Sequence, residues 1–466
     1  MPRLAVALPY WSFWEASVAG DLREAKSAVL QRAVTMLQPH ADVVLETVVA
    51  SREDGQQLAA LARERGAESL LILQTMAVPP AYLDAALRIL PELPLIIWAV
   101  GPPASLPQPF DHGAITTEGA TVGVPMLTNL LVRRNRPFQL VFGPLDDAAT
   151  LRRVGDVASA AAAASGLSRA RIGQVGQPPD GYDSVKLDPT RLLQQTGMSV
   201  VPIEPAEVRD LYQQVSADRL DALRKETEAG YDIDASARGD SLDRSLRLAG
   251  AMDELVVRHG LDAGAMNCHV PEIRFGKPIE ITPCFALGRL TSAGVPWSCA
   301  GDTLTAIAML CVKRLGGGAL YHEVEALDAA TGEFVLANTG EHDLAFAGAR
   351  RPRLVCNGWF EKDAHCGVCA HLSPPAGPAT LVGFTELDAP RPRYRLIAAA
   401  GEFTDRSWPA ISTPSASFRF RGQNPGDAWI RWCRAGVNHH SAATPGDFVN
   451  RLEHLAALMG CEFVAV

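Results

Sequence analysis

Two short segments, ESLLILQTM (68–76) and LPLIIWAVG (93–101), indicate the fold of the first third of the chain. Both contain runs of Leu, Ile and Val without polar alternation, which is typical of strands that are covered on both faces. Helical patterns separate them from each other and from the strand-like RLAVALPY (3–10) and DVVLETVVA (42–50). Alternating strands and helices of this kind predict a doubly wound parallel α/β domain over residues 1–136.

A second domain of the same kind is expected over residues 137–316. It begins with the strand-like RPFQLVFG (136–143), continues through an alanine-rich helical stretch and includes the strand-like RIGQVG (171–176). From residue 317 the pattern changes to short strands, such as ALYHEVEALD (319–328), which Gly, Pro and Asp turns separate. Residues 317–466 are therefore predicted to form a mainly antiparallel, barrel-like β domain with a terminal helix. The predicted fold class is α/β, with two parallel-sheet domains before the β-rich one.

The composition excludes several classes of protein. With 47% hydrophobic and 20% charged residues among 466, the chain resembles an ordinary globular protein. Its net charge of −9 argues against a nucleic-acid partner, which requires a basic face. No apolar stretch reaches the ~18–20 residues of a membrane span, and no glycine-rich loop indicates a nucleotide cofactor. Nine cysteines without a secretory signal suit a reducing compartment, so a soluble cytoplasmic protein is expected.

Residue types that bind metals gather at several turns and strand ends. They are Asp302 in SCAGDTLTA (298–306), then His322, Glu323, Glu325 and Asp328 on one predicted strand, then Glu341, His342 and Asp343 in a loop, and last the adjacent pair His439 and His440. Each group also has an ordinary structural interpretation, such as a helix cap for the first and a solvated edge strand for the second. Because adjacent residues cannot share one face of a strand, one histidine of the pair is expected to point into a site.

Three segments, taken in order, resemble a known group of enzymes. CAGDTLTAIAML (299–310), GGGALYHEVEALD (316–328) and GVNHHSAATPGDF (436–448) are similar to segments of the L-arabinose isomerase and L-fucose isomerase superfamily. The resemblance covers most of the chain. It implies a metal-dependent enzyme that interconverts an aldose and a ketose, a pentose or hexose, through an enediolate. It also implies a homo-oligomer, a trimer or hexamer, in which neighbouring subunits help to close the active site.

The resemblance implies roles for individual residues. Asp302 matches a metal-binding aspartate and is also a catalytic candidate, and Glu323 matches a carboxylate that is both a ligand and a proton-transfer group. One of His439 and His440, with a slight preference for His440, matches a late histidine ligand. His342 is the nearest match to a further histidine ligand.

At three positions this chain departs from the pattern of the superfamily or allows an alternative match. Arabinose-type members carry a glutamate where this chain has Ala300, so the site looks fucose-like or has lost a carboxylate. Fucose-type members have another acid upstream, for which Glu280 is the match, as a catalytic candidate, and Glu272 a weaker one. Because the loop before His342 is longer here, Asn338 is the alternative at that position.

The donor set also favours particular metals and leaves other reactions open. Two carboxylates with one or two imidazoles suit Mn²⁺, Co²⁺ or Mg²⁺, and a nearby carboxylate could move a proton between C2 and C1 of the sugar. The same fold could instead serve an epimerase or lyase that acts on a polyhydroxy acid or modified sugar, or a sugar-binding protein without metal. A zinc hydrolase built on HCGVCAH (365–371) is a weaker alternative, because a single C-x-x-C is a weak motif.

Several residues are candidates for contact with a sugar, although aromatic side chains more often belong to a core. They are Trp11, Trp14, Trp297, Trp359 and the hydrogen-bonding Glu402.

Overall fold

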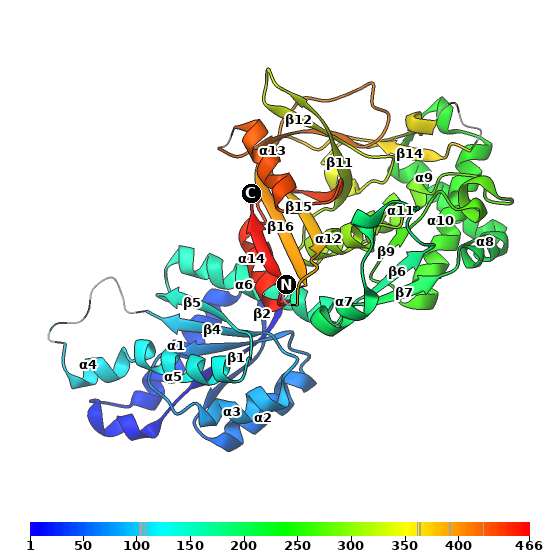
Figure 1. Cartoon of the computed structure of the whole chain (residues 1–466). Helices are drawn as coiled ribbons and strands as arrows, with labels where there is room; N and C mark the ends of the chain where they lie inside the picture. The colour runs from blue at the N-terminus through cyan, green and yellow to red at the C-terminus, as the bar shows by residue number, and fades with distance from the viewer. Residues whose placement is uncertain are drawn as a thin grey trace. The chain divides into compact units, whose positions relative to one another are not determined.

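The computed structural model describes residues 1–466 apart from 102–105, 107, 109, 361, 363–364, 391–392 and 423. It divides into two compact units (Figure 1). The first unit comprises residues 1–166 with 457–459, and the second comprises residues 167–456 with 460–466. None of the helices in the described part of the chain combines the length and the apolar character of a membrane span.

The first unit is built on a five-stranded sheet with the order β2-β1-β3-β4-β5, in which every neighbouring pair is parallel. Its strands are β1 (Arg3–Pro9), β2 (Asp42–Val49), β3 (Ser69–Gln74), β4 (Leu95–Val100) and β5 (Gln139–Gly143). Its helices are α1 (Leu22–Leu37), α2 (Arg52–Glu64), α3 (Ala81–Ile89), α4 (His112–Thr117), α5 (Ala120–Arg133) and α6 (Ala148–Leu167).

Helices cover both faces of this sheet. Leu4 and Val6 of β1 belong to a buried cluster with α1 and α6, whereas Ala5 and Ala7 belong to a cluster with α2, α3 and α5. Because successive strand residues point to opposite faces, the two clusters lie on opposite sides of the sheet. The predicted parallel α/β unit is confirmed. It extends past the predicted boundary at residue 136, since β5 pairs with β4.

The second unit begins with a four-stranded parallel sheet of order β10-β9-β6-β7. Its strands are β6 (Arg171–Val175), β7 (Ser199–Ile203), β9 (Ala263–Met266) and β10 (Trp297–Ser298). The accompanying helices are α7 (Pro189–Thr196), α8 (Pro205–Gln214), α9 (Ala217–Gly230), α10 (Asp240–His259), α11 (Cys284–Ser292) and α12 (Thr303–Arg314). A second parallel sheet is thus confirmed.

A larger sheet follows, with the order β15-β18-β11-β12-β17-β16-β19 and a further pairing of β15 with β16. Its strands are β11 (Leu320–Asp328), β12 (Glu333–Ala337), β15 (Gly377–Glu386), β16 (Tyr394–Phe403), β17 (Ser415–Phe420), β18 (His440–Pro445) and β19 (Glu462–Ala465). Only β19 pairs in parallel among these described strands, so the predicted antiparallel character is confirmed for most of the sheet. Its barrel-like closure, and a domain boundary near residue 316, stay predictions.

Smaller elements complete the second unit. A three-stranded sheet combines β8 (Asp232–Ile233), β13 (Arg353–Cys356) and β14 (Val368–His371), and two helices, α13 (Pro425–Arg434) and α14 (Val449–Leu458), flank β18 in sequence. Helix α12 packs against β15, next to which it lies in Figure 1, and it also packs against β18. Asp302, directly before α12, lies within hydrogen-bond distance of His440, the first residue of β18, and this junction positions the candidate site.

Candidate metal centre

Asp302 caps the N-terminus of α12 after a tight loop. Its Oδ1 accepts from the backbone N–H of Thr305 (2.9 Å), and its Oδ2 accepts from the Thr305 hydroxyl (2.8 Å). The loop before it contains Ala300 at a φ of 52° and Gly301 at 68°. A left-handed backbone costs a non-glycine residue about 1–2 kcal/mol. Such strain persists where the surroundings enforce it, and it often accompanies function.

The pairing of β11 with β18 brings a carboxylate and an imidazole together. Glu323 is the cross-strand partner of His440, so their side chains share one face of the sheet. His440 Nε2 lies 3.1 Å from Glu323 Oε1, and His440 Nδ1 lies 2.8 Å from Asp302 Oδ2. The amide of Asn438 also donates to Asp302 Oδ2 (2.8 Å). Asp302, His440 and Glu323 therefore form a continuous hydrogen-bonded chain.

The two carboxylates change the protonation of His440. Burial alone would lower the pKa of His440, but the hydrogen bonds and charges of Asp302 and Glu323 outweigh it and raise the pKa to about 9. The same contact with His440 lowers the pKa of Glu323. In the metal-free protein, His440 is thus an imidazolium between two carboxylates near neutral pH.

The donor set fits a divalent cation. Glu323, His439 and His440 each offer a ligand atom, and these atoms lie within 4.8 Å of one another. A carboxylate with two imidazoles suits a borderline metal such as Mn²⁺ or Co²⁺. Asp302 holds Nδ1 of His440, which leaves Nε2 for a metal, the usual arrangement of a carboxylate behind a ligand histidine.

The structure changes two details of the predicted ligand set. Both His439 and His440 turn toward Glu323, because His439 precedes β18 in a loop where strand alternation does not apply. Asp302 does not join the three converging residues but supports His440 from behind. Its oxygens already accept hydrogen bonds from Thr305, Asn438 and His440.

His342 and Asn338 are engaged elsewhere. His342 Nε2 lies 2.8 Å from the hydroxyl of Tyr231, its ring packs near Phe285, and burial lowers its pKa to about 3. Asn338 donates to the backbone carbonyls of Tyr321 and Glu341, so it braces the loop after β12. The structure brings neither residue into the three-residue group.

Three further predicted residues, Glu280, Glu402 and Trp297, contact residues outside the group of Glu323, His439 and His440. Glu280 lies 3.6 Å from the guanidinium of Arg244 on α10, and Glu402 pairs with Arg419 at 2.9 Å. Trp297 is completely buried in the core, where its ring lies against Gly264, so it does not line a sugar pocket.

The other three tryptophan candidates lie at or near a surface. Trp359 is 54% exposed after β13. Trp11 and Trp14 belong to the first unit and pack edge to face with centroids 5.7 Å apart. Their contact with substrate stays a prediction.

The HCGVCAH segment (365–371) has no metal-ligand geometry among the described residues. Cys366 Sγ lies 2.6 Å from Cys356 Sγ, whereas Cys369 is buried on β14 beside Cys284 and Val355. In the described part of the chain the only group with converging metal ligands is Glu323, His439 and His440. The structure therefore does not favour the zinc alternative.

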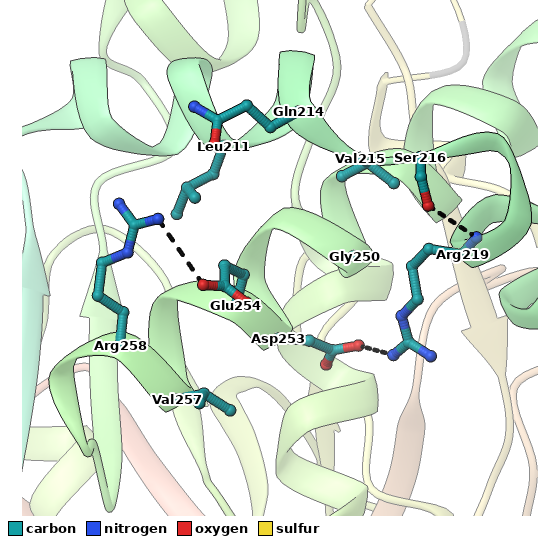
Figure 2. A pocket seen from close by; sticks show the side chains of 10 residues that line it. All are labelled: Leu211, Gln214, Val215, Ser216, Arg219, Gly250, Asp253, Glu254, Val257 and Arg258. Atoms are coloured by element: carbon teal, nitrogen blue, oxygen red, sulfur yellow. Dashed lines mark hydrogen bonds and ion pairs between the residues drawn. The ribbon is translucent and has the colours of Figure 1, made fainter.

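A surface hollow of about 400 Å³ lies between α8, α9 and α10 (Figure 2). Its lining includes none of Glu323, His439 and His440. Figure 2 shows that its charged side chains face one another. Arg219 pairs with Asp253, and Arg258 pairs with Glu254 at 3.7 Å. Both carboxylates of the lining are thus paired with arginines, and neither belongs to the group of converging metal ligands.

Burial of His322 predicts a loss of stability in mild acid. Burial lowers the pKa of His322 to about 4, whereas an unfolded histidine titrates near 6.5. The neutral ring therefore contributes stability that is complete above pH 6.5 and falls as the pH drops toward 4, by up to about 3 kcal/mol. His322→Gln should flatten the decline of the unfolding temperature between pH 7 and 4.5, and the exposed His112→Gln should not. An unchanged profile in H322Q would contradict this assignment.

Known proteins with similar sequences include two kinds of sugar isomerase. No family model matches the chain. The chain is 22% identical over 373 residues to sulfoquinovose isomerase of Priestia megaterium, with 79% of each chain covered. It is 24% identical over 349 residues to L-arabinose isomerase of Aeromonas hydrophila subsp. hydrophila, covering 72% of this chain and 68% of that protein. Over most of its length this chain is therefore similar to proteins of the L-arabinose isomerase-like superfamily. The predicted resemblance and the assignment to the sugar isomerases are confirmed.

Two residues at this candidate site were not among those predicted from the sequence. Asn438 directly precedes the histidine pair, and an amide at that place could have been considered as a partner for a carboxylate. Tyr182 lies edge-on to His439 with ring centroids 5.6 Å apart, but nothing in its sequence context links it to a segment about 250 residues later.

Proposed function

We propose that this isomerase interconverts an aldose and a ketose with a bound divalent cation, and that Glu323, His439 and His440 hold the cation. The observation that carries the proposal is the hydrogen-bonded chain Asp302–His440–Glu323, with His439 beside it. A bound cation would supply Lewis acidity toward the carbonyl and hydroxyl oxygens of the opened sugar. Mn²⁺ suits this donor set, and Co²⁺ or Mg²⁺ are its alternatives.

Glu323 is the group that we propose to move the proton between C2 and C1. Its side chain is 32% exposed, whereas Asp302 and His440 are buried, so Glu323 is the member of the chain that a substrate can reach. The carboxylate takes the C2 proton and returns it to C1 through an enediolate, while the hydroxyl proton moves from O2 to O1, so that the aldose becomes the ketose. A positioned base of this kind contributes about 10²–10⁴ in rate.

In the metal-free protein His440 and Asp302 orient Glu323. With a cation bound, Nε2 of His440 would be a ligand and Asp302 would orient the ring, and neither residue touches the reacting carbons. The Glu323 carboxylate is the cross-strand partner of the imidazole, and Asp302 fixes which ring nitrogen faces it. This is the preorganisation that proton transfer requires, because the donor and acceptor atoms are held before the substrate arrives.

The proposed substrate is a free pentose or hexose in its open-chain form. The relatives are named for sulfoquinovose and for L-arabinose, so both a sulfonated and a neutral sugar are reasonable substrates to test. We also infer a cytoplasmic homo-oligomer, a trimer or hexamer, from the family resemblance. Light scattering of the purified protein tests that state.

Metal removal gives the test of this proposal. Protein treated with a chelator and then dialysed should lose at least about 100-fold of its ketose formation from a panel of aldoses, and Mn²⁺ should restore it. The panel contains L-arabinose, L-fucose, D-glucose and 6-deoxy-6-sulfoglucose.

Two results would count against the aldose–ketose assignment. Turnover that a chelator leaves intact would contradict the metal centre. Deuterium exchange from solvent at the carbon beside the carbonyl, without any ketose, would instead indicate an epimerase on the same fold.

A further inference from the structure

A small cavity lies beneath the loop of residues 176–188, next to the start of α12. Its volume is about 250 Å³, and its lining includes Gln174, Gln177, Lys186 and Thr303. Small-molecule pockets usually have about 300–1,000 Å³, so this cavity fits part of a small ligand. The loop follows β6, and Thr303 follows closely on β10. The cavity therefore lies toward the carboxyl ends of parallel strands, where α/β sheets bind ligands.

The same loop reaches the metal centre at two places. The ring of Tyr182 lies edge-on to His439, with centroids 5.6 Å apart, and it is 40% exposed. Pro178 approaches Gly301 so closely that a Cβ at Gly301 would lie 3.1 Å from the proline Cα. The loop 176–188 therefore borders both the cavity and the residues that we propose to hold the metal.

Thr303 supplies an unused hydrogen-bonding group. Its side chain is 1% exposed, and its hydroxyl has no hydrogen-bond partner among the described residues. The hydroxyl of Thr305, two residues further along, is bonded to Asp302. A buried hydroxyl without a partner is unfavourable. Thr303 is among the residues that line the cavity, so a ligand hydroxyl that reaches its enclosed oxygen would supply the missing partner.

The charges around the cavity favour a neutral ligand. The one lysine in its lining, Lys186, bonds to Asp183 at 2.6 Å, and this contact and Asp180 raise the pKa of Lys186. The positive charge is thus matched by carboxylates. The amides of Gln174 and Gln177 can both donate and accept, which suits sugar hydroxyls.

We propose that this cavity binds the end of the sugar chain that lies away from the reacting carbons, and that it selects neutral hydroxyl groups there. The inference rests on the proposed function, because C1 and C2 are taken to lie at Glu323. Thr303, Gln174 and Gln177 bond the distal hydroxyls, and Tyr182 covers the chain beside the metal centre. The preferred substrates are neutral aldoses of five or six carbons.

Binding of sugar alcohols to the metal-free protein tests the cavity without any turnover. Calorimetry with arabitol and glucitol should show that Thr303→Val weakens their affinity about 5–10-fold, as loss of one hydrogen bond does, and leaves glycerol unaffected. The unfolding temperature of T303V should stay equal or rise, since valine removes an unsatisfied hydroxyl. In the loaded enzyme T303V should raise KM for a pentose by the same factor and leave kcat within about twofold.

Thr413→Val is the matched control. Its hydroxyl is also buried and unpartnered among the described residues, but Thr413 does not line the cavity, so sugar-alcohol affinity should not change. Alditol affinity unchanged in T303V would overturn the proposal. Tighter binding of a 6-sulfonated hexose than of the neutral hexose, lost in Lys186→Ala, would overturn the neutral selectivity. If the wild-type protein binds alditols through Thr303 but isomerises no sugar, the proposed function is contradicted and the binding cavity is not.

Discussion

Glu323→Gln is expected to lower kcat for ketose formation by about 10²–10⁴-fold. Glutamine keeps the volume of the side chain but cannot take a proton from carbon, so the loss measures the proposed base directly. The structure supports this expectation because Glu323 is partly exposed and His440 holds its carboxylate at 3.1 Å. Initial rates over a range of sugar concentrations, at saturating Mn²⁺, separate kcat from KM.

A strand glutamate away from the site provides the control for that loss. Glu462 on β19 is also partly exposed and pairs with Arg395. Glu462→Gln therefore removes the same negative charge as Glu323→Gln does, but it should leave kcat near the wild-type value. A kcat within about threefold of wild type in E323Q would show that another group moves the proton.

Asp302→Asn is expected to weaken Mn²⁺ binding by about 10–100-fold. Removing a carboxylate behind a ligand histidine typically has that effect. Asp302 accepts from His440, Asn438 and Thr305 at once, and an asparagine amide cannot accept all of these hydrogen bonds. His440 then loses the partner that fixes its Nδ1. Calorimetric titration of the metal-free protein with Mn²⁺ measures the affinity.

The pH dependence of Mn²⁺ affinity gives the same variant a second readout. Because the two carboxylates raise the pKa of His440 to about 9, binding at neutral pH displaces a proton, and wild-type affinity should rise about tenfold per pH unit below pH 9. D302N should show a shallower rise. Wild-type affinity and pH dependence retained in D302N would mean that Asp302 acts only as a helix cap.

The parallel sheets could be read from the sequence because β3 and β4 are buried on both faces. Such strands carry near-continuous apolar runs, and their short length between helical patterns distinguishes them from buried helices. The end of the first sheet was harder to place. Only alternate residues of β5 are buried, so its pattern does not reveal that β5 pairs with β4.

The site could be predicted in part. Asp302, Glu323 and His440 occur in the order that the family resemblance requires, and the structure links them by hydrogen bonds. Their individual roles depend on directions that a sequence does not contain. Asp302 faces the histidine because it caps α12, and His439 joins the group because its backbone lies just before β18.

Burial in the folded protein separates two other predicted site residues, Trp297 and His342, from the candidate site. Trp297 and His342 look like surface or ligand residues in isolation, yet both are enclosed by residues distant in the chain, Gly264 in one case and Tyr231 in the other. Those contacts arise only from the tertiary fold. A local pattern therefore cannot separate a buried aromatic or histidine from one that meets a substrate.

Anomalous diffraction from crystals soaked in Mn²⁺ tests the central claim most directly. We expect one strong manganese peak within coordination distance of the Glu323 carboxylate and of His440 Nε2, with His439 beside it, and loss of that peak in crystals of a His440→Asn variant. A manganese ion bound away from Glu323 and His440, or an ordered ion that survives the His440 substitution, would contradict the proposed metal centre.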